Sequence, residues 1–184
     1  NSGKVIISRI NSSCLKEISK TFPKKYIKTN DLARTIVISN QKPRQKLSGS
    51  VAIITAGTAD IPVAEESKVI LEEVGCKIIT CYDVGIAGIH RLFDSLSSVI
   101  KEDVDVIIAV AGREGAMPSI IAGMVDIPVI GVPTSIGYGY GDKGISALMS
   151  MLQSCSLGIA TVNIDSGIAA GVIASTIAKN KSIK

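Results

Sequence analysis

The sequence predicts a doubly wound α/β domain, in which helices cover both faces of a parallel sheet. Two observations lead to this fold class. After residue 50, short apolar runs alternate regularly with helix-like stretches, as they do in chains built from successive β-α units. Hydrophobic residues make up 46% of the chain and aromatic residues only 3%, so Val, Ile, Leu and Ala must build the interior. That mixture is typical of buried parallel strands.

The expected strands and helices alternate along residues 51–179. Strands are expected at 51–55, 77–80, 106–110, 129–132 and 159–162. Helices are expected at 61–74, 86–101, 115–124, 143–155 and 167–179. The first helix has the clearest boundaries, because Asp60 is a suitable N-cap, Pro62 falls in its first turn and Gly75 stands at the C′ position.

The composition changes near residue 50. The first fifty residues carry eleven Lys or Arg and two acids, whereas the remainder carries nine and fourteen. Strands are expected at 4–9 and 34–38, a short helix at 12–21, and a linker at 40–50. We therefore expect residues 1–49 to be a partial N-terminal segment with a linker, and residues 50–184 to be the main domain.

Several classes of protein fit the sequence poorly. No apolar stretch is long enough to span a membrane, and the four scattered cysteines favour a reducing cytoplasm over a disulfide scaffold or a zinc site. The basic segment lacks aromatic stacking residues, which favours a solvated face or a surface for an anionic substrate over nucleic-acid binding. No Walker loop and no GxGxxG motif follow the first strand, so neither ATP-driven chemistry nor a redox cofactor is expected.

Ligands of such sheets bind beyond the carboxyl ends of the strands. The chain places Gly-rich loops at four of these positions, 56–60, 82–85, 111–115 and 133–141. Backbone NH groups in loops of this kind can approach a phosphate closely. The single histidine, His90, lies on the same side of the sheet, where it is either a structural residue or a catalytic one.

Six segments of the chain together resemble the pyridinium-3,5-biscarboxylic acid mononucleotide synthase (LarB) family. They are AGTADIPVAEE (56–66), DVGIAGIHR (83–91), AGREGAMPS (111–119), VPTSIGYG (132–139), and SC (154–155) followed by VNIDSG (162–167). The first three are more distantly similar to aminoimidazole ribonucleotide carboxylase (PurE). The resemblance implies a three-layer, flavodoxin-like (PurE-like) catalytic domain that assembles into a homo-octamer.

The same resemblance implies a reaction on nicotinic acid adenine dinucleotide. The pyridinium ring would be carboxylated at C5 by CO₂ or bicarbonate, and the phosphoanhydride would be hydrolysed to release AMP. The product, pyridinium-3,5-biscarboxylic acid mononucleotide, leads to the nickel-pincer nucleotide cofactor of lactate racemase. Mg²⁺ is a possible cofactor.

A cysteine suits this chemistry because a pyridinium carbon is electron-poor. A thiolate that adds at C4 makes C5 nucleophilic. Cys155 occupies the Ser-Cys motif and is the candidate nucleophile, although a lone cysteine is commonly a small core residue. We expect it near the C-terminus of a helix, and we expect Cys14, Cys76 and Cys81 to be packing residues.

The resemblance also indicates other site residues. Glu114 could take the C5 proton or orient water. Asp60 and Asp83 could bind ribose hydroxyls or Mg²⁺ at the pyrophosphate, or could merely cap and turn the chain. The expected substrate-binding residues are Gly57, Thr58, Asp60, Asp83, Gly85, Arg91, Gly112, Arg113, Thr134, Ser135 and Gly137, and His90 joins Cys155 and Glu114 as a catalytic candidate.

Two alternatives remain open. An aminoimidazole ribonucleotide carboxylase acts on a substrate that is already an electron-rich enamine, and would need no cysteine. A non-catalytic nucleotide-binding oligomer would keep the fold without turnover. Oligomerisation is also expected, because residues 167–178 carry no charge on any face of the last helix; the alternative is that this helix packs wholly within its own subunit.

Overall fold

The N-terminal part of the chain forms a small antiparallel sheet with one helix. The computed structural model describes residues 3–40, 49–137 and 139–181, without the side chains of residues 142, 180 and 181. The elements of this part are β1 (Lys4–Ile7), α1 (Ser12–Thr21), β2 (Ile27–Asn30) and β3 (Thr35–Ser39), in the sheet order β1-β3-β2. The predicted helix 12–21 is confirmed, and the strand predicted at 4–9 ends at Ile7. The sequence analysis missed β2. Most of the predicted linker, residues 41–48, lies outside the described residues.

The main domain contains a five-stranded parallel sheet, as predicted. Its strands are β4 (Ser50–Thr55), β5 (Lys77–Cys81), β6 (Val106–Ala111), β7 (Val129–Pro133) and β8 (Ile159–Thr161). They lie in the order β5-β4-β6-β7-β8, which is the flavodoxin-like order. The central strands β4 and β6 are in register, with Ile53 opposite Ile108, and all their residues are buried.

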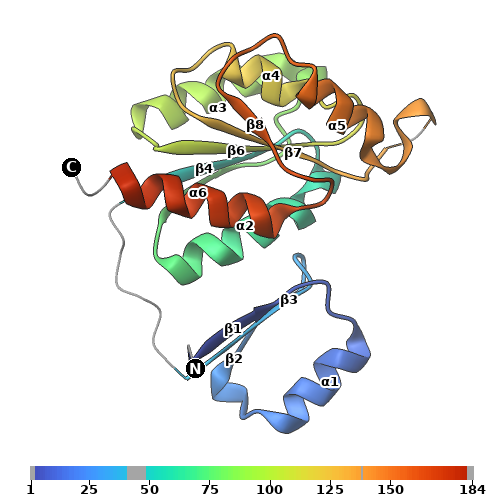
Figure 1. Ribbon diagram of the computed structural model, residues 1–184, viewed down its shortest axis with the longest axis vertical. Coiled ribbons are helices and arrows are strands. Elements are labelled where there is room, and N and C mark those ends of the chain that lie inside the picture. The colour runs from blue at the N-terminus through green and yellow to red at the C-terminus, as the bar shows by residue number, and fades with distance from the viewer. Residues whose placement is uncertain (1–2, 41–48, 138, 182–184) are drawn as a thin grey trace.

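Helices cover both faces of this sheet (Figure 1). One face carries α2 (Ile61–Val74) and α6 (Gly167–Lys181), and the other carries α3 (Ile89–Lys101), α4 (Met117–Ala122) and α5 (Ile145–Leu152). The sheet has a hydrophobic core on each face, and alternate residues of β4 point into one or the other. Val51 and Ile53 pack with α2 and α6, while Ala52 and Ile54 pack in the core on the opposite face. Each buried isoleucine stabilises the fold by about 1.5–3 kcal/mol.

The boundaries of α2 follow the sequence prediction, but α3, α4 and α5 are shorter than the helices expected at 86–101, 115–124 and 143–155. Pro62 stands in the first turn of α2, and Gly75 ends it in the left-handed region at φ 91°. The helices predicted at 115–124 and 143–155 begin late because Gly115 and Gly144 have φ of 63° and 76°, which an α-helix does not accept. Short 3₁₀ turns, Ile86–Gly88 and Gly139–Gly144, precede α3 and α5.

The last helix packs on its own subunit along a narrow stripe of alanines. Ala170, Ala174 and Ala178 are fully buried, whereas Val172 and Ile173 are 49% and 42% exposed. The helix therefore does not bury all its apolar residues within one chain. No helix in the described part of the chain has the length and apolar content needed to cross a bilayer.

Candidate functional site

The loops at the carboxyl edge of the sheet surround a cavity of about 600 Å³. It lies where the loops after β4, β5, β6 and β7 meet. The chain runs from β4 to β5 on one side and from β6 to β7 on the other, so the cavity lies at the switch point of the sheet, the usual ligand site of this fold. The volume is in the range of small-molecule sites.

Asp60 joins three of these loops. Its Oδ2 accepts a hydrogen bond from the Gly57 NH at 2.8 Å, and its Oδ1 accepts one from the Thr134 hydroxyl at 2.7 Å. The Gly112 NH also bonds to this carboxylate. Burial raises the pKa of Asp60 above its ordinary value, although these three hydrogen bonds oppose the change.

Asp60 stands at the predicted N-cap position of α2, but the expected side-chain cap is absent. Its backbone is already helical, with φ −83° and ψ −14°, and its side chain makes no capping bond to α2. The carboxylate turns back to the cavity loops because the Gly57 NH and the Thr134 hydroxyl lie there. Asp60 therefore organises the site.

Glycine is required at two places where neighbouring loops touch. A Cβ on Gly112 would overlap the carbonyl oxygen of Ile136 and lie 2.6 Å from the Thr134 hydroxyl oxygen. A Cβ on Gly85 would overlap the carbonyl oxygen of Ala56. Both glycines let the backbones approach more closely than any other residue would allow.

The loop after β6 presents a carboxylate at the cavity. Arg113 has a left-handed backbone with φ 46°, its NH donates to the Ile136 carbonyl at 3.2 Å, and its own carbonyl accepts from the Ser146 hydroxyl at 2.6 Å. Glu114 follows this turn, lines the cavity and is exposed. An accessible carboxylate beside a ligand cavity can act as a base.

Asp83, Arg91 and His90 lie beside the cavity rather than in its lining. The Asp83 carboxylate pairs with Arg91 at 3.0 Å, and the Asp83 NH donates to the Thr55 hydroxyl at 3.0 Å. Asp83 is left-handed, with φ 59°, so the pair fixes a sharp turn after β5. His90 is exposed in the first turn of α3.

The donor set does not favour the predicted Mg²⁺ site. The Asp60 oxygens are engaged by Gly57 and Thr134, and the Asp83 carboxylate is paired with a cation. Within the described residues, no three His, Cys, Asp or Glu side chains gather as metal ligands. Mg²⁺ prefers an octahedral set of oxygen ligands.

The structure brings together half of the predicted site residues. Those lining the cavity are Gly57, Asp60, Gly85, Gly112, Arg113, Glu114 and Gly137. Those outside the lining are Thr58, Asp83, His90, Arg91, Thr134, Ser135 and Cys155. Sequence analysis missed an apolar wall that includes Ile86, Met117 and Ile136. The sequence signal that could have revealed this wall is an apolar residue close to a glycine in three of the loops.

Cys155 lies in a second cavity of about 450 Å³, which shares Ala116 with the first. Cys155 lies near the C-terminus of a helix, as expected, but α5 ends at Leu152 and does not include it, so Cys155 stands in the turn that follows. The Ser156 hydroxyl ties this turn to α4 by donating to the Ser119 carbonyl at 2.7 Å. The Cys155 thiol is exposed and next to the Gly-rich cavity, but not in its lining.

The other thiols differ in exposure. Cys76 and Cys81 are half-buried against the two cores, and burial raises the pKa of both thiols. Cys14 is exposed on α1, so the prediction that it is a packing residue is wrong. Cys155 is therefore the exposed thiol of the main domain.

The strand order and the glycine-lined cavity at the switch point define a flavodoxin-like α/β domain with a ligand site. Comparison with known proteins identifies the family. Residues 50–184 match the family model of AIR carboxylase, and the chain belongs to this family.

Relatives of known sequence agree with that assignment. An uncharacterized protein of Methanocaldococcus jannaschii is 60% identical over 164 residues, which are 89% of this chain and 63% of that protein. The N5-carboxyaminoimidazole ribonucleotide mutase of Thermotoga maritima is 32% identical over 69% of this chain and 73% of its own. The mutase of Pyrococcus horikoshii is 34% identical over 67% and 69%.

A solved structure supports the fold. The crystal structure of a variant of Treponema denticola PurE2 matches with a TM-score of 0.51 and 18% identity, over 73% of this chain and 93% of that chain. At this identity the likeness shows the fold alone, which confirms the prediction of a PurE-like parallel sheet.

Proposed function

We propose that the protein is a pyridinium carboxylase that converts nicotinic acid adenine dinucleotide to pyridinium-3,5-biscarboxylic acid mononucleotide and AMP. Membership of the AIR carboxylase family supports an enzyme that handles a carboxyl group on a nucleotide substrate. The segments 132–139, 154–155 and 162–167, through which the chain resembles the LarB family, support the pyridinium substrate.

The exposed Cys155 thiol is the observation that carries this proposal. It lies in a cavity that adjoins the Gly-rich one through Ala116, so one extended ligand could reach both. The Gly-rich loops around Asp60 and Gly112 line the first cavity, where the phosphates would bind. A thiolate at that point could add to an electron-poor pyridinium ring and make it nucleophilic, whereas an enamine is already nucleophilic and needs no such addition.

The proposed reaction balances without an oxidant or a reductant. The Cys155 thiolate adds to C4 of the ring, and the resulting enamine attacks CO₂ through C5. Glu114 then removes the C5 proton, and expulsion of the thiolate restores the aromatic ring. Water cleaves the phosphoanhydride in a separate step, which leaves AMP and the mononucleotide.

Three further points belong to this proposal. The enzyme would be a homo-octamer, as the resemblance implies, and would work in the cytoplasm, which the scattered cysteines favour. It would use CO₂ or bicarbonate as co-substrate and no redox cofactor. Its product would feed the synthesis of the nickel-pincer nucleotide of lactate racemase.

The test is incubation of the protein with nicotinic acid adenine dinucleotide and ¹³C-bicarbonate, read by mass spectrometry. We expect AMP and a mononucleotide that carries the label. Cys155→Ser should lose about 10²-fold or more in labelled product, because its hydroxyl is a far weaker nucleophile at neutral pH. Cys14→Ser is the matched control, since Cys14 is equally a free, exposed thiol but lies on α1. Near-normal labelling by Cys155→Ser would contradict the covalent mechanism.

A carboxylase or mutase acting on an aminoimidazole ribonucleotide is the second candidate. Two observations favour it: the mutases of Thermotoga maritima and Pyrococcus horikoshii are relatives, and Cys155 lies outside the lining of the Gly-rich cavity. Turnover of the aminoimidazole ribonucleotide, unaffected by Cys155→Ser, would support this candidate. Binding of either nucleotide without turnover would instead indicate a non-catalytic nucleotide-binding oligomer.

A further inference from the structure

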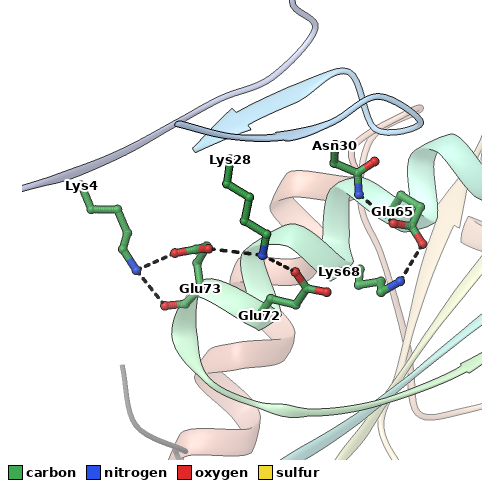
Figure 2. A network of polar contacts seen from close by, with 7 residues as sticks. All are labelled: Lys4, Lys28, Asn30, Glu65, Lys68, Glu72 and Glu73. Atoms are coloured by element: carbon green, nitrogen blue, oxygen red, sulfur yellow. Dashed lines mark hydrogen bonds and ion pairs between the residues drawn. The ribbon is translucent and has the colours of Figure 1, made fainter. Parts of the chain in front are cut away.

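The N-terminal sheet is docked on α2 by ion pairs and by a small apolar contact. Lys4 bonds to Glu73 at 2.6 Å, and Lys28 bonds to Glu72 at 2.8 Å. Figure 2 shows these lysines reaching from the small sheet to the glutamates of α2. Beneath them, Val37 packs on Val69. The helix α2 thus lies between two sheets (Figure 1).

The contact continues toward the carboxyl edge of the main sheet. Asn30 donates to Glu65 at 2.7 Å, and Tyr82 donates to the same side chain at 2.7 Å. Tyr82 directly precedes Asp83 in the loop after β5. The docked surface therefore extends from Glu73 near the end of α2 to the edge where the ligand cavity lies.

Arg9 makes a further contact, with the segment that follows β8. It stands in the turn between β1 and α1, with a left-handed backbone at φ 56°. Its Nη2 donates to the carbonyl oxygen of Asp165 at 3.2 Å. These two residues are 156 positions apart.

Asp165 in turn holds the loop after β7. Its Oδ1 accepts from the Ser135 NH at 2.8 Å, and its own NH donates to the Pro133 carbonyl at 2.9 Å. Asp165 is itself left-handed, with φ 54°. A non-glycine residue in that region persists only where its surroundings fix it.

Four hydrogen bonds anchor the loop of residues 134–136. The Thr134 hydroxyl bonds to Asp60, the Thr134 NH donates to the Ala111 carbonyl, and the Ile136 carbonyl accepts from the Arg113 NH. The fourth bond runs from the Ser135 NH to Asp165. The first three bonds belong to the main domain alone, whereas the fourth depends on a residue that Arg9 contacts.

Glu66 makes the position of Arg9 more favourable. This buried carboxylate accepts hydrogen bonds from the NH groups of Ile168 and Gly167, at the start of α6. Burial raises the pKa of Glu66, and the positive charge of Arg9 opposes that change. Arg9 thus bonds to the Asp165 carbonyl oxygen and lies close enough to Glu66 for their charges to interact.

We propose that Arg9 is a positioning residue of the ligand site, through which the docked N-terminal sheet holds Asp165 and, with it, the Ser135 loop. Arg9 does not line the cavity, so its effect passes through Asp165. The inference rests on the contacts of the chain and not on the identity of the substrate.

Hydrogen–deuterium exchange of the full chain tests the proposal. In Arg9→Ala, the Ser135 and Asp165 amides should exchange about fivefold faster or more, the equivalent of one lost hydrogen bond. Arg9→Lys keeps the charge and should recover part of the protection. Arg34→Ala is the matched control, because Arg34 is exposed and left-handed in the same sheet, with φ 49°, but bonds to Ile10 within that sheet.

Two outcomes would overturn the proposal. One is unchanged exchange at Ser135 and Asp165 in Arg9→Ala. The other is an equal acceleration in Arg34→Ala, since that result would assign the effect to loosening of the whole sheet. For any substrate that the enzyme turns over, Arg9→Ala should raise KM more than it lowers kcat, because the residue positions a binding loop and touches no reacting atom.

Discussion

The Thr134 hydroxyl donates a hydrogen bond to the Asp60 carboxylate at 2.7 Å, and both residues are buried, at 0% and 4% exposure. The bond links the loop after β7 to the loop after β4, across the loop after β6 that lies between them. Water cannot easily replace the hydroxyl at a buried position. The bond is therefore one of the contacts that shape the cavity, and it joins side chains that are 74 positions apart in the sequence.

Removal of this donor should cost stability. Thr134→Val keeps the shape but leaves a buried carboxylate oxygen without its partner, so we expect the free energy of unfolding to fall by about 1–3 kcal/mol. Urea unfolding followed by circular dichroism measures the change. Thr35→Val is the matched control, because the Thr35 hydroxyl is also buried but has no hydrogen-bond partner within the described residues. The control should be neutral or stabilising, and a loss of stability in the control alone would contradict the argument.

The raised pKa of Asp60 predicts a pH dependence of stability. A carboxyl whose pKa is higher in the folded state than its ordinary value of 3.8 binds its proton more tightly when folded. Its contribution is therefore present at low pH and is lost as the pH rises through the folded-state pKa. Asn in place of Asp60 keeps the shape, can accept from the Gly57 NH and can donate to Thr134, but does not titrate.

We expect wild type to lose stability relative to Asp60→Asn as the pH rises from about 3 to 7. Urea midpoints of the two proteins across this range measure the difference. A difference that stays constant, or that changes in favour of wild type as the pH rises, would show that the pKa of Asp60 is not raised.

The exposed residues of α6 predict self-association. Val172 and Ile173 are large, apolar and about half exposed. Apolar side chains that lie together on a surface commonly mark a protein interface. A charge on this face, as in Ile173→Lys, should shift the protein to a smaller species in light scattering at micromolar concentration. Leu32→Lys is the control, since Leu32 is 60% exposed in the turn between β2 and β3 and its substitution should leave the assembly unchanged. A monomeric wild-type protein would refute the prediction.

The sequence by itself determined the elements of the main domain. All five parallel strands were predicted close to their observed positions, and both ends of α2 were predicted correctly. These features follow from local signals: apolar runs for the strands, and Pro62 and Gly75 for the helix. The Gly-rich loops were also predictable, because strand direction places the carboxyl ends of parallel strands at one edge.

Only the tertiary structure decided which residues meet at that edge. The short strand β2 has the sequence Ile-Lys-Thr-Asn, whose polar residues give little local signal for a strand, and it forms by pairing with β3. Asp60 has the features of a helix cap in the sequence, yet its partners come from three loops. Packing between distant segments also decides two other features. Cys155 does not line the Gly-rich cavity, and Arg9 donates a hydrogen bond to the Asp165 carbonyl. Local propensity carries no information about such contacts, because their energy exists only after the two sheets and their helices have packed together.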